Sequence, residues 1–168
     1  MRPSPFLKIR QREPSGRLQR ESVAEITATA TRNRIRVGVR PGDARSQLAG
    51  SVFGRLCLQQ EINARQYEAG CRFGVTVVRY AKVMGFASLN PRSLDMLMLG
   101  GGGHGEEAGD AEAIAQARRR YEDMFTALND APDGKRYLRA LKTCILQNQH
   151  AELGDLRCGL NILCRLWG

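Results

Sequence analysis

The 168-residue sequence predicts an all-α protein: a single small helical domain of about five helices with a long glycine-rich loop, preceded by a basic, largely disordered arm. Large apolar residues recur every three or four positions along most of the chain, as on one face of a helix. Ser, Asp and Asn stand where several of these stretches begin, as N-cap residues do. Residues 1–21 and 100–109 hold mainly glycine, proline or charge, so we expect them to be mobile. The arm should cover residues 1–40 and the helical domain residues 41–168.

The arm itself contains two local signals. Ser22 followed by Glu25 matches a capping box and predicts a short helix over residues 22–30. Residues 34–39 alternate between polar and apolar side chains, which is a strand pattern. A single strand has no partner for its backbone groups, so we expect extended coil there.

The first two helices of the domain are predicted from cap residues. Asp43 is a candidate N-cap for a helix over residues 44–60. A second capping box, Asn63 with Gln66, begins the next helix. Gly85 is well placed to end that helix in the left-handed conformation.

Three further helices follow the glycine-rich loop. Asp110 should begin the third, and the Pro-Asp-Gly turn at residues 132–134 separates it from the fourth. Leucines spaced by three and four residues mark the fifth, which should run to the end of the chain. The residues expected in the core are Phe53, Leu56, Tyr67, Phe73, Val77, Tyr121, Phe125, Leu141, Leu160 and Trp167.

The metal-binding and redox residues form no recognisable pattern. The five cysteines are Cys57, Cys71, Cys144, Cys158 and Cys164. Their number is odd and they contain no C-x-x-C pair, so we expect neither a disulfide framework nor a zinc site. We expect most of them to be reduced and buried on apolar helix faces. The two histidines, His104 and His150, are far apart in loops, so no metal or other cofactor is predicted.

Motifs of catalysis and of membrane insertion are missing from the sequence. The run over residues 100–103 lacks the Lys-Ser or Lys-Thr of a P-loop and reads as a linker, and no G-x-S-x-G elbow is found. We therefore expect a non-enzymatic protein. No apolar run approaches the roughly 20 residues that span a bilayer, and the N-terminus has no signal-peptide core. We expect a cytoplasmic protein, or one delivered to the cytoplasm by a virus.

Positive charge is concentrated in the arm. Residues 1–40 hold ten Lys and Arg against three acidic residues, a net +7 of the total +9. Residues 41–168 hold sixteen against fourteen, which leaves little charge for a basic face on the domain. An arginine-rich arm can contact phosphates and gain affinity by counterion release. A solubilising tail, or arginine enrichment by GC-rich codons, explains the composition equally well.

The candidate nucleic-acid-binding residues are the arginines spaced along this arm. They are Arg10, Arg12, Arg17, Arg20, Arg32, Arg34, Arg36 and Arg40. A second basic run, Arg118, Arg119 and Arg120, falls inside a predicted helix. Consecutive residues there fan out over about 200°, so they cannot meet one groove and should form a solvated face.

Two patterns carry a family resemblance. One is Gln66-Tyr67-Glu68-Ala69-Gly70-Cys71-Arg72-Phe73, and the other is Leu156-Arg157-Cys158-Gly159-Leu160-Asn161-Ile162-Leu163. Together with the glycine-rich insert between them, they resemble small helical proteins of alphaproteobacteria and their prophages. The stretch over residues 45–168 is also similar to the C-terminal domain of unknown function of gene-transfer-agent activators. Those activators have a helix-turn-helix-like segment where this chain has only residues 147–152, so we do not expect the folded domain to read DNA sequence.

The resulting hypothesis is a non-enzymatic accessory protein of phage or prophage type. It would associate with DNA, or with a DNA-bound complex, through the basic arm, weakly and without sequence preference. The alternative is a protein-interaction or regulatory module, binding a protein partner or a second copy of itself, with no nucleic-acid contact. No membrane partner is expected.

Overall fold

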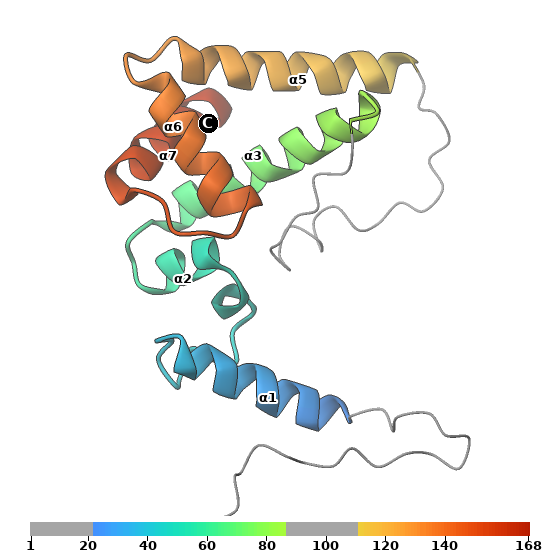
Figure 1. The fold of residues 1–168 in the computed structure, drawn as a ribbon. Coiled ribbons are helices and arrows are strands. Elements are labelled where there is room, and N and C mark those ends of the chain that lie inside the picture. The colour runs from blue at the N-terminus through green and yellow to red at the C-terminus, as the bar shows by residue number, and fades with distance from the viewer. Residues whose placement is uncertain (1–21, 87–110) are drawn as a thin grey trace, which may run out of the picture.

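The computed structural model describes residues 22–86 and 111–168, and every regular element in these stretches is helical (Figure 1). The all-α prediction is confirmed. The elements in chain order are α1 Val23–Arg36, a 3₁₀ helix Gln47–Gly50, α2 Val52–Leu58, α3 Ala64–Val83, α5 Ala111–Asn129, α6 Gly134–Leu141, a π-helical turn Lys142–Leu146 and α7 Leu153–Trp167. None of these helices has the combination of length and apolar character that crossing a bilayer requires. The mobility expected for residues 1–21 and 100–109, and the helix start expected at Asp110, lie outside the described residues.

Both predicted capping boxes are present. The Glu25 amide donates to Ser22 Oγ at 3.2 Å, and the Ser22 amide donates to Glu25 Oε2 at 3.1 Å. At the start of α3, the Gln66 amide donates to Asn63 Oδ1 at 2.8 Å, and the Asn63 amide donates back to Gln66 Oε1 at 2.9 Å. Each pair satisfies two of the amides that a helix start leaves without an intrahelical partner. Gly85, with φ of 67°, ends α3 as predicted.

The first helix is longer than predicted. It runs through Arg36, so the extended coil expected over residues 34–39 is wrong for its first three residues. The helix ends at Gly38, which has a φ of 90°. The Gly38 amide donates to the Ile35 carbonyl and the Val39 amide to the Arg34 carbonyl, both at 3.0 Å, which is the Schellman pattern. Gly38 therefore indicates the local structure better than the alternating side chains before it, because it marks where the helix ends.

The helix predicted over residues 44–60 is divided into two. Ser46 caps the 3₁₀ helix through the Leu48 amide, and Ser51 caps α2 by accepting from the Gly54 amide at 2.9 Å. Gly54 also passes so close to the Leu48 carbonyl that a Cβ atom there would clash. Two serine caps and a glycine contact thus interrupt a pattern whose apolar spacing alone reads as one helix.

The core lies between α3, α5, α6 and α7, and α7 packs against the other three. Five predicted core residues are fully buried: Phe53, Phe73, Val77, Leu141 and Leu160. Four more are partly buried and pack against the core: Leu56, Tyr67, Tyr121 and Trp167. The prediction for Phe125 is wrong, because its side chain is 39% exposed. Met124 and Leu128 form the buried line of α5, and Phe125 is turned by about 100° from Met124 on the helix.

The two patterns that carry the family resemblance are packing patterns in this fold. The Phe53 ring lies against Gly70 of α3, where a side chain would not fit, and stacks on Tyr67 with centroids 5.1 Å apart. On α7, Gly159 lets the Leu141 side chain approach the helix backbone. Small residues at these positions let neighbouring elements come close and bring their large side chains together.

Polar contacts join α7 to the start of α3. Gln66 is 8% exposed, and its side-chain nitrogen donates to Asn161 Oδ1 at 2.9 Å. Arg157 Nε donates to the Glu61 carbonyl at 2.6 Å, and its Nη2 lies 2.7 Å from Glu61 Oε2. These contacts satisfy polar groups at the edge of the apolar core and fix the turn before α3.

The burial of the five cysteines differs from the expectation. Cys144 is 1% exposed, whereas Cys57, Cys71 and Cys164 are only partly buried. Cys158 is exposed and only Cys144 is buried, so the expectation that most of the cysteines are buried is wrong. Cys158 lies on the outer side of α7, although its neighbours in the sequence, Leu156, Gly159 and Leu160, are buried.

Candidate nucleic-acid interface

Helix α1 stands apart from the helical core (Figure 1). None of its residues is buried, and Val23 and Ile26 are 81% and 53% exposed. A 14-residue helix without tertiary packing is marginal in water, so its local bonds matter. Besides the capping box, the hydroxyls of Thr27 and Thr31 donate to the carbonyls of Val23 and Thr27 at 2.7 and 2.8 Å.

Arg34 ties α1 to the rest of the fold. Its Nη1 donates to the carbonyls of Ala44 and Ser46 at 2.9 and 3.1 Å, and its side chain is partly buried. The segment that it holds includes Ala44, which belongs to a small buried cluster with Val39 and Ala49. Arg34 therefore orients α1 through backbone carbonyls, and its guanidinium is already engaged.

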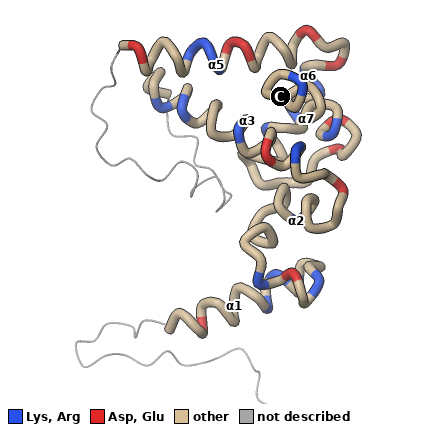
Figure 2. The backbone as a smooth tube through the Cα atoms, turned by 180° about the vertical axis from the view of Figure 1, so that it is seen from behind, with Lys and Arg blue, Asp and Glu red and all other residues tan. Residues whose placement is uncertain are grey.

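Three other candidate arginines are exposed near the end of α1. Arg32, Arg36 and Arg40 all face solvent, and Arg32 donates within its own helix to the Ala28 carbonyl and the Thr29 hydroxyl at 3.4 Å. Figure 2 shows the Lys and Arg positions gathering at the end of α1 that joins the rest of the chain. Residues 22–46 hold five arginines against two acidic residues. Cations at a helix C-terminus also suit the negative end of the helix dipole.

The structure thus separates the eight predicted site residues into three groups. Arg32 and Arg36, one turn apart on α1, and Arg40 after it are exposed cations, and Arg34 serves as the tether. Arg10, Arg12, Arg17 and Arg20 lie outside the described residues. The second basic run behaves as predicted, because Arg118, Arg119 and Arg120 are all exposed on α5.

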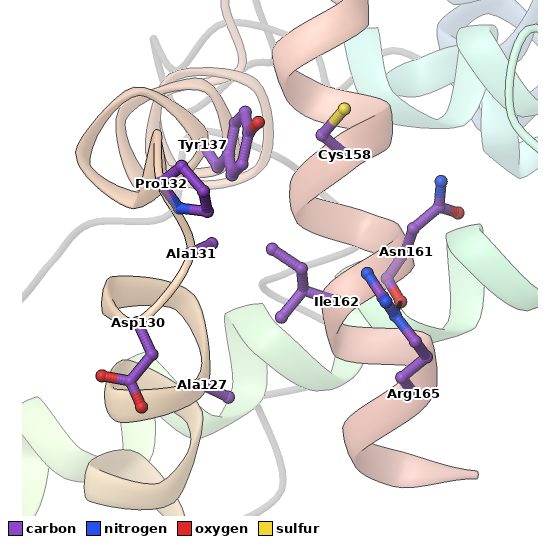
Figure 3. A pocket seen from close by; sticks show the side chains of 9 residues that line it. All are labelled: Ala127, Asp130, Ala131, Pro132, Tyr137, Cys158, Asn161, Ile162 and Arg165. Atoms are coloured by element: carbon purple, nitrogen blue, oxygen red, sulfur yellow. Dashed lines mark hydrogen bonds between the residues drawn. The ribbon is translucent and has the colours of Figure 1, made fainter.

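A shallow cavity of about 490 Å³ opens between the α5–α6 turn and α7. In Figure 3, Tyr137 and Pro132 face Cys158, Asn161 and Ile162 across it. Burial, and then the neighbouring Cys158, Asp133 and Asp155, raise the pKa of Tyr137. Its hydroxyl therefore keeps its proton at neutral pH and is no base for the Cys158 thiol. The residues that line the cavity include no histidine.

Metal ligands do not gather in the described part of the chain. No group of three or more His, Cys, Asp or Glu side chains there could hold a metal ion. His150 is an exposed loop residue, and His104 lies outside the described residues.

An exposed group of rings between α3 and α5 was missed by the sequence reasoning. Tyr80 and Tyr121 stack with centroids 3.9 Å apart and planes 6° from parallel. Phe86 contacts Tyr80, and Phe125 contacts Tyr121, at centroid distances of 6.2 and 6.0 Å. We call these four residues the aromatic ladder. Helical spacing had placed Tyr121 and Phe125 in the core, and only the position of Phe86 after the helix-ending Gly85 indicated exposure.

Comparison of the chain with protein-family models, with curated proteins and with solved structures gives no match. The function must therefore be argued from the geometry of the chain.

Proposed function

We propose that this protein is a non-enzymatic accessory protein that associates with DNA, or with a DNA-bound complex, through its basic N-terminal region. The observation that carries the proposal is the group of exposed arginines Arg32, Arg36 and Arg40 on and after a helix that stands away from the core. The phage or prophage type rests on the sequence resemblance alone.

Charge and geometry support a backbone contact rather than sequence reading. The first 40 residues carry +7 of the net +9 charge. Guanidinium groups match the geometry of phosphate oxygens, and neutralised phosphates release counterions. No residue of α1 is buried, so all sides of the helix except the Arg34 tether can approach a duplex. Binding through phosphates alone carries no base information, so we expect a Kd of about 10⁻⁴–10⁻⁶ M at physiological salt.

The test is a titration of the full chain onto duplex DNA at several salt concentrations. The triple variant Arg32→Ala/Arg36→Ala/Arg40→Ala should bind more weakly, and the slope of log K against log salt should shrink by up to about 2.7, or 0.9 per lost contact. The matched control removes the same charge from exposed sites elsewhere, as Arg119→Ala/Arg120→Ala/Arg139→Ala. Equal losses in the two triple variants would mean that only net charge matters, and the proposed interface would be wrong.

A second candidate function is a protein-interaction module. It is favoured by Val23 and Ile26, which are exposed on the same side of α1. If the full chain binds no duplex even at low salt, this candidate replaces the first. Val23→Asp/Ile26→Asp should then abolish partner binding or self-association while leaving the helical core folded.

A further inference from the structure

We propose that the aromatic ladder is a stacking platform for single-stranded nucleic acid. The inference extends the proposed function to a second surface, and the two surfaces can be tested separately. Two ends of the ladder are open: Phe86 is 58% exposed and Phe125 is 39% exposed. Between them, the partly buried pair Tyr80 and Tyr121 anchors the ladder on α3 and α5.

Exposed rings of this kind favour a flat aromatic partner. Large apolar side chains that gather on a surface usually mark a contact site. Bases of a single strand expose both π-faces, and they stack on protein rings with little regard to sequence. A duplex hides those faces between its base pairs, so the aromatic ladder should distinguish single strands from duplexes.

Exposed arginines lie on the same two helices as the rings of the ladder. Arg118 lies one turn before Tyr121 on α5, and its Nε is 3.2 Å from the Met84 sulfur at the end of α3. Arg72 and Arg79 are exposed on α3, on the side of the helix next to Tyr80. Arg72 also lies over the ring of Trp167, 4.8 Å from its centroid. Glu122, exposed beside Arg118, offsets part of this charge.

The charge of the described helices differs from the near neutrality expected for the domain. Residues 47–86 hold five basic and two acidic residues, and residues 111–168 hold nine and seven. Their sum is fourteen against nine, a net of +5. The domain appeared nearly neutral because residues 87–110 contribute one basic and four acidic residues. The described helices of the domain therefore carry a net positive charge, which favours a polyanion.

The other possible occupant is a protein segment, including residues 87–110, which continue the chain directly from Phe86. Arginines beside flat rings favour a strand that carries both phosphates and bases over an apolar peptide. The two occupants predict different results for the same variant. If nucleic acid stacks on the aromatic ladder, a variant without the exposed rings should lose affinity for single strands. If a protein segment covers the ladder, the same variant should lose stability and keep its affinity.

The experiment measures binding of the full chain to a labelled 20-nucleotide oligo-dT and to a duplex of equal length. The variant is Phe86→Ala/Phe125→Ala, and the control is Leu166→Ala, at an exposed apolar residue of α7 that belongs to neither proposed surface. The ladder variant should lose about tenfold or more in oligo-dT affinity and keep its duplex affinity. The control should keep both affinities.

Three results would overturn the inference. They are absence of oligo-dT binding by the wild-type chain, equal losses in the ladder variant and its control, and an unchanged affinity with a lowered unfolding midpoint. If the double variant does not fold, Phe86→Ala alone serves, because Phe86 is the more exposed ring. The arginine triple variant of α1 should lose duplex affinity in either case, so failure here leaves the first proposal standing.

Discussion

Phe53 on α2 occupies the space that a side chain at Gly70 on α3 would need, with Cζ and Cε1 of its ring against the glycine. Tyr67, one turn before Gly70 on α3, stacks on the Phe53 ring at a centroid distance of 5.1 Å. The Ile145 side chain closes the site from the π-helical turn. Phe53 thereby helps Val52 to fix this short helix of seven residues to the core.

Gly70→Ala should destabilise the protein by about 1–3 kcal/mol, because the added methyl group overpacks a filled site and must displace Phe53. Urea unfolding followed by circular dichroism measures this as a lower midpoint with an unchanged slope. Gly42→Ala is the matched control, because nothing lies within 4 Å of a Cβ atom there. Equal stability of the two variants would show that Phe53 does not depend on this contact.

Gln60→Gly should stabilise the protein by about 1 kcal/mol, because a non-glycine residue in the left-handed region is strained. Gln60 has a φ of 60° and ends α2. The Glu61 amide donates to the Leu56 carbonyl at 2.9 Å, as at a helix end where glycine is usual. Gln59→Gly is the control, since Gln59 has an ordinary φ of −81° and glycine there should only cost stability. A loss of stability at both positions would contradict the prediction.

Caps and apolar spacing allowed most of the fold to be predicted from the sequence. Ser22, Asn63 and Gly85 act where their residue types indicate, because a cap depends on only a few neighbouring residues. Gln60 ends a helix without the residue type that usually does so, and only the tertiary fold determines that. Phe125 fits the apolar face of α5 by spacing, yet the packing of α5 leaves it at the edge.

The candidate site could be predicted only as a set of arginines. Arg32, Arg34 and Arg36 look alike in sequence, spaced two residues apart. Arg34 alone reaches the carbonyls of Ala44 and Ser46, and that contact depends on the turn after α1. The aromatic ladder was unpredictable for a related reason, because its four rings come from segments far apart in the chain.

Variants of Asn148 should distinguish the stability gained from its helix cap from the stability lost to its backbone strain. Its Oδ1 accepts from the Val52 amide at 2.7 Å at the start of α2, and its φ is 53°. Asn148→Asp keeps the acceptor and should change stability little. Asn148→Gly loses the bond but relieves the strain, and Asn148→Ala loses the bond and keeps the strain, at a cost of about 1–2 kcal/mol. Thermal unfolding should rank them Asp, Gly, Ala, and an Ala variant as stable as the wild type would exclude a capping role.

Stability should fall between about pH 9 and 11 as Cys144 titrates. Burial raises the pKa of its thiol from 9.0 to about 11, so the unfolded chain loses this proton first as the pH rises. Below pH 9 both the folded and the unfolded chain hold the proton, so this contribution to stability is fully present. As the pH rises from 9 to 11, the free energy of unfolding falls by at most about 3 kcal/mol. Cys144→Ala should flatten this part of the stability profile. An unchanged profile in the Cys144 variant would assign the alkaline loss to other groups, such as Tyr121, whose pKa burial also raises.

Arg34 and Arg32 should respond differently to replacement by lysine. Lysine keeps the charge but cannot reproduce the fixed guanidinium geometry that reaches the carbonyls of Ala44 and Ser46. Arg34→Lys and Arg34→Ala should therefore both speed hydrogen exchange of the α1 amides, by about tenfold for a lost hydrogen bond of this type. The core should unfold as before, because no residue of α1 is buried.

The matched pair is Arg32→Lys and Arg32→Ala. Arg32 is exposed, so lysine there should leave both the exchange of α1 and most of the duplex affinity unchanged, while alanine should lower the affinity. For Arg34, duplex affinity should fall in both variants, because the orientation of α1 is lost along with its tether. If Arg34→Lys instead keeps slow exchange and full affinity, Arg34 contributes only charge, and the orientation of α1 must come from the turn over residues 37–46.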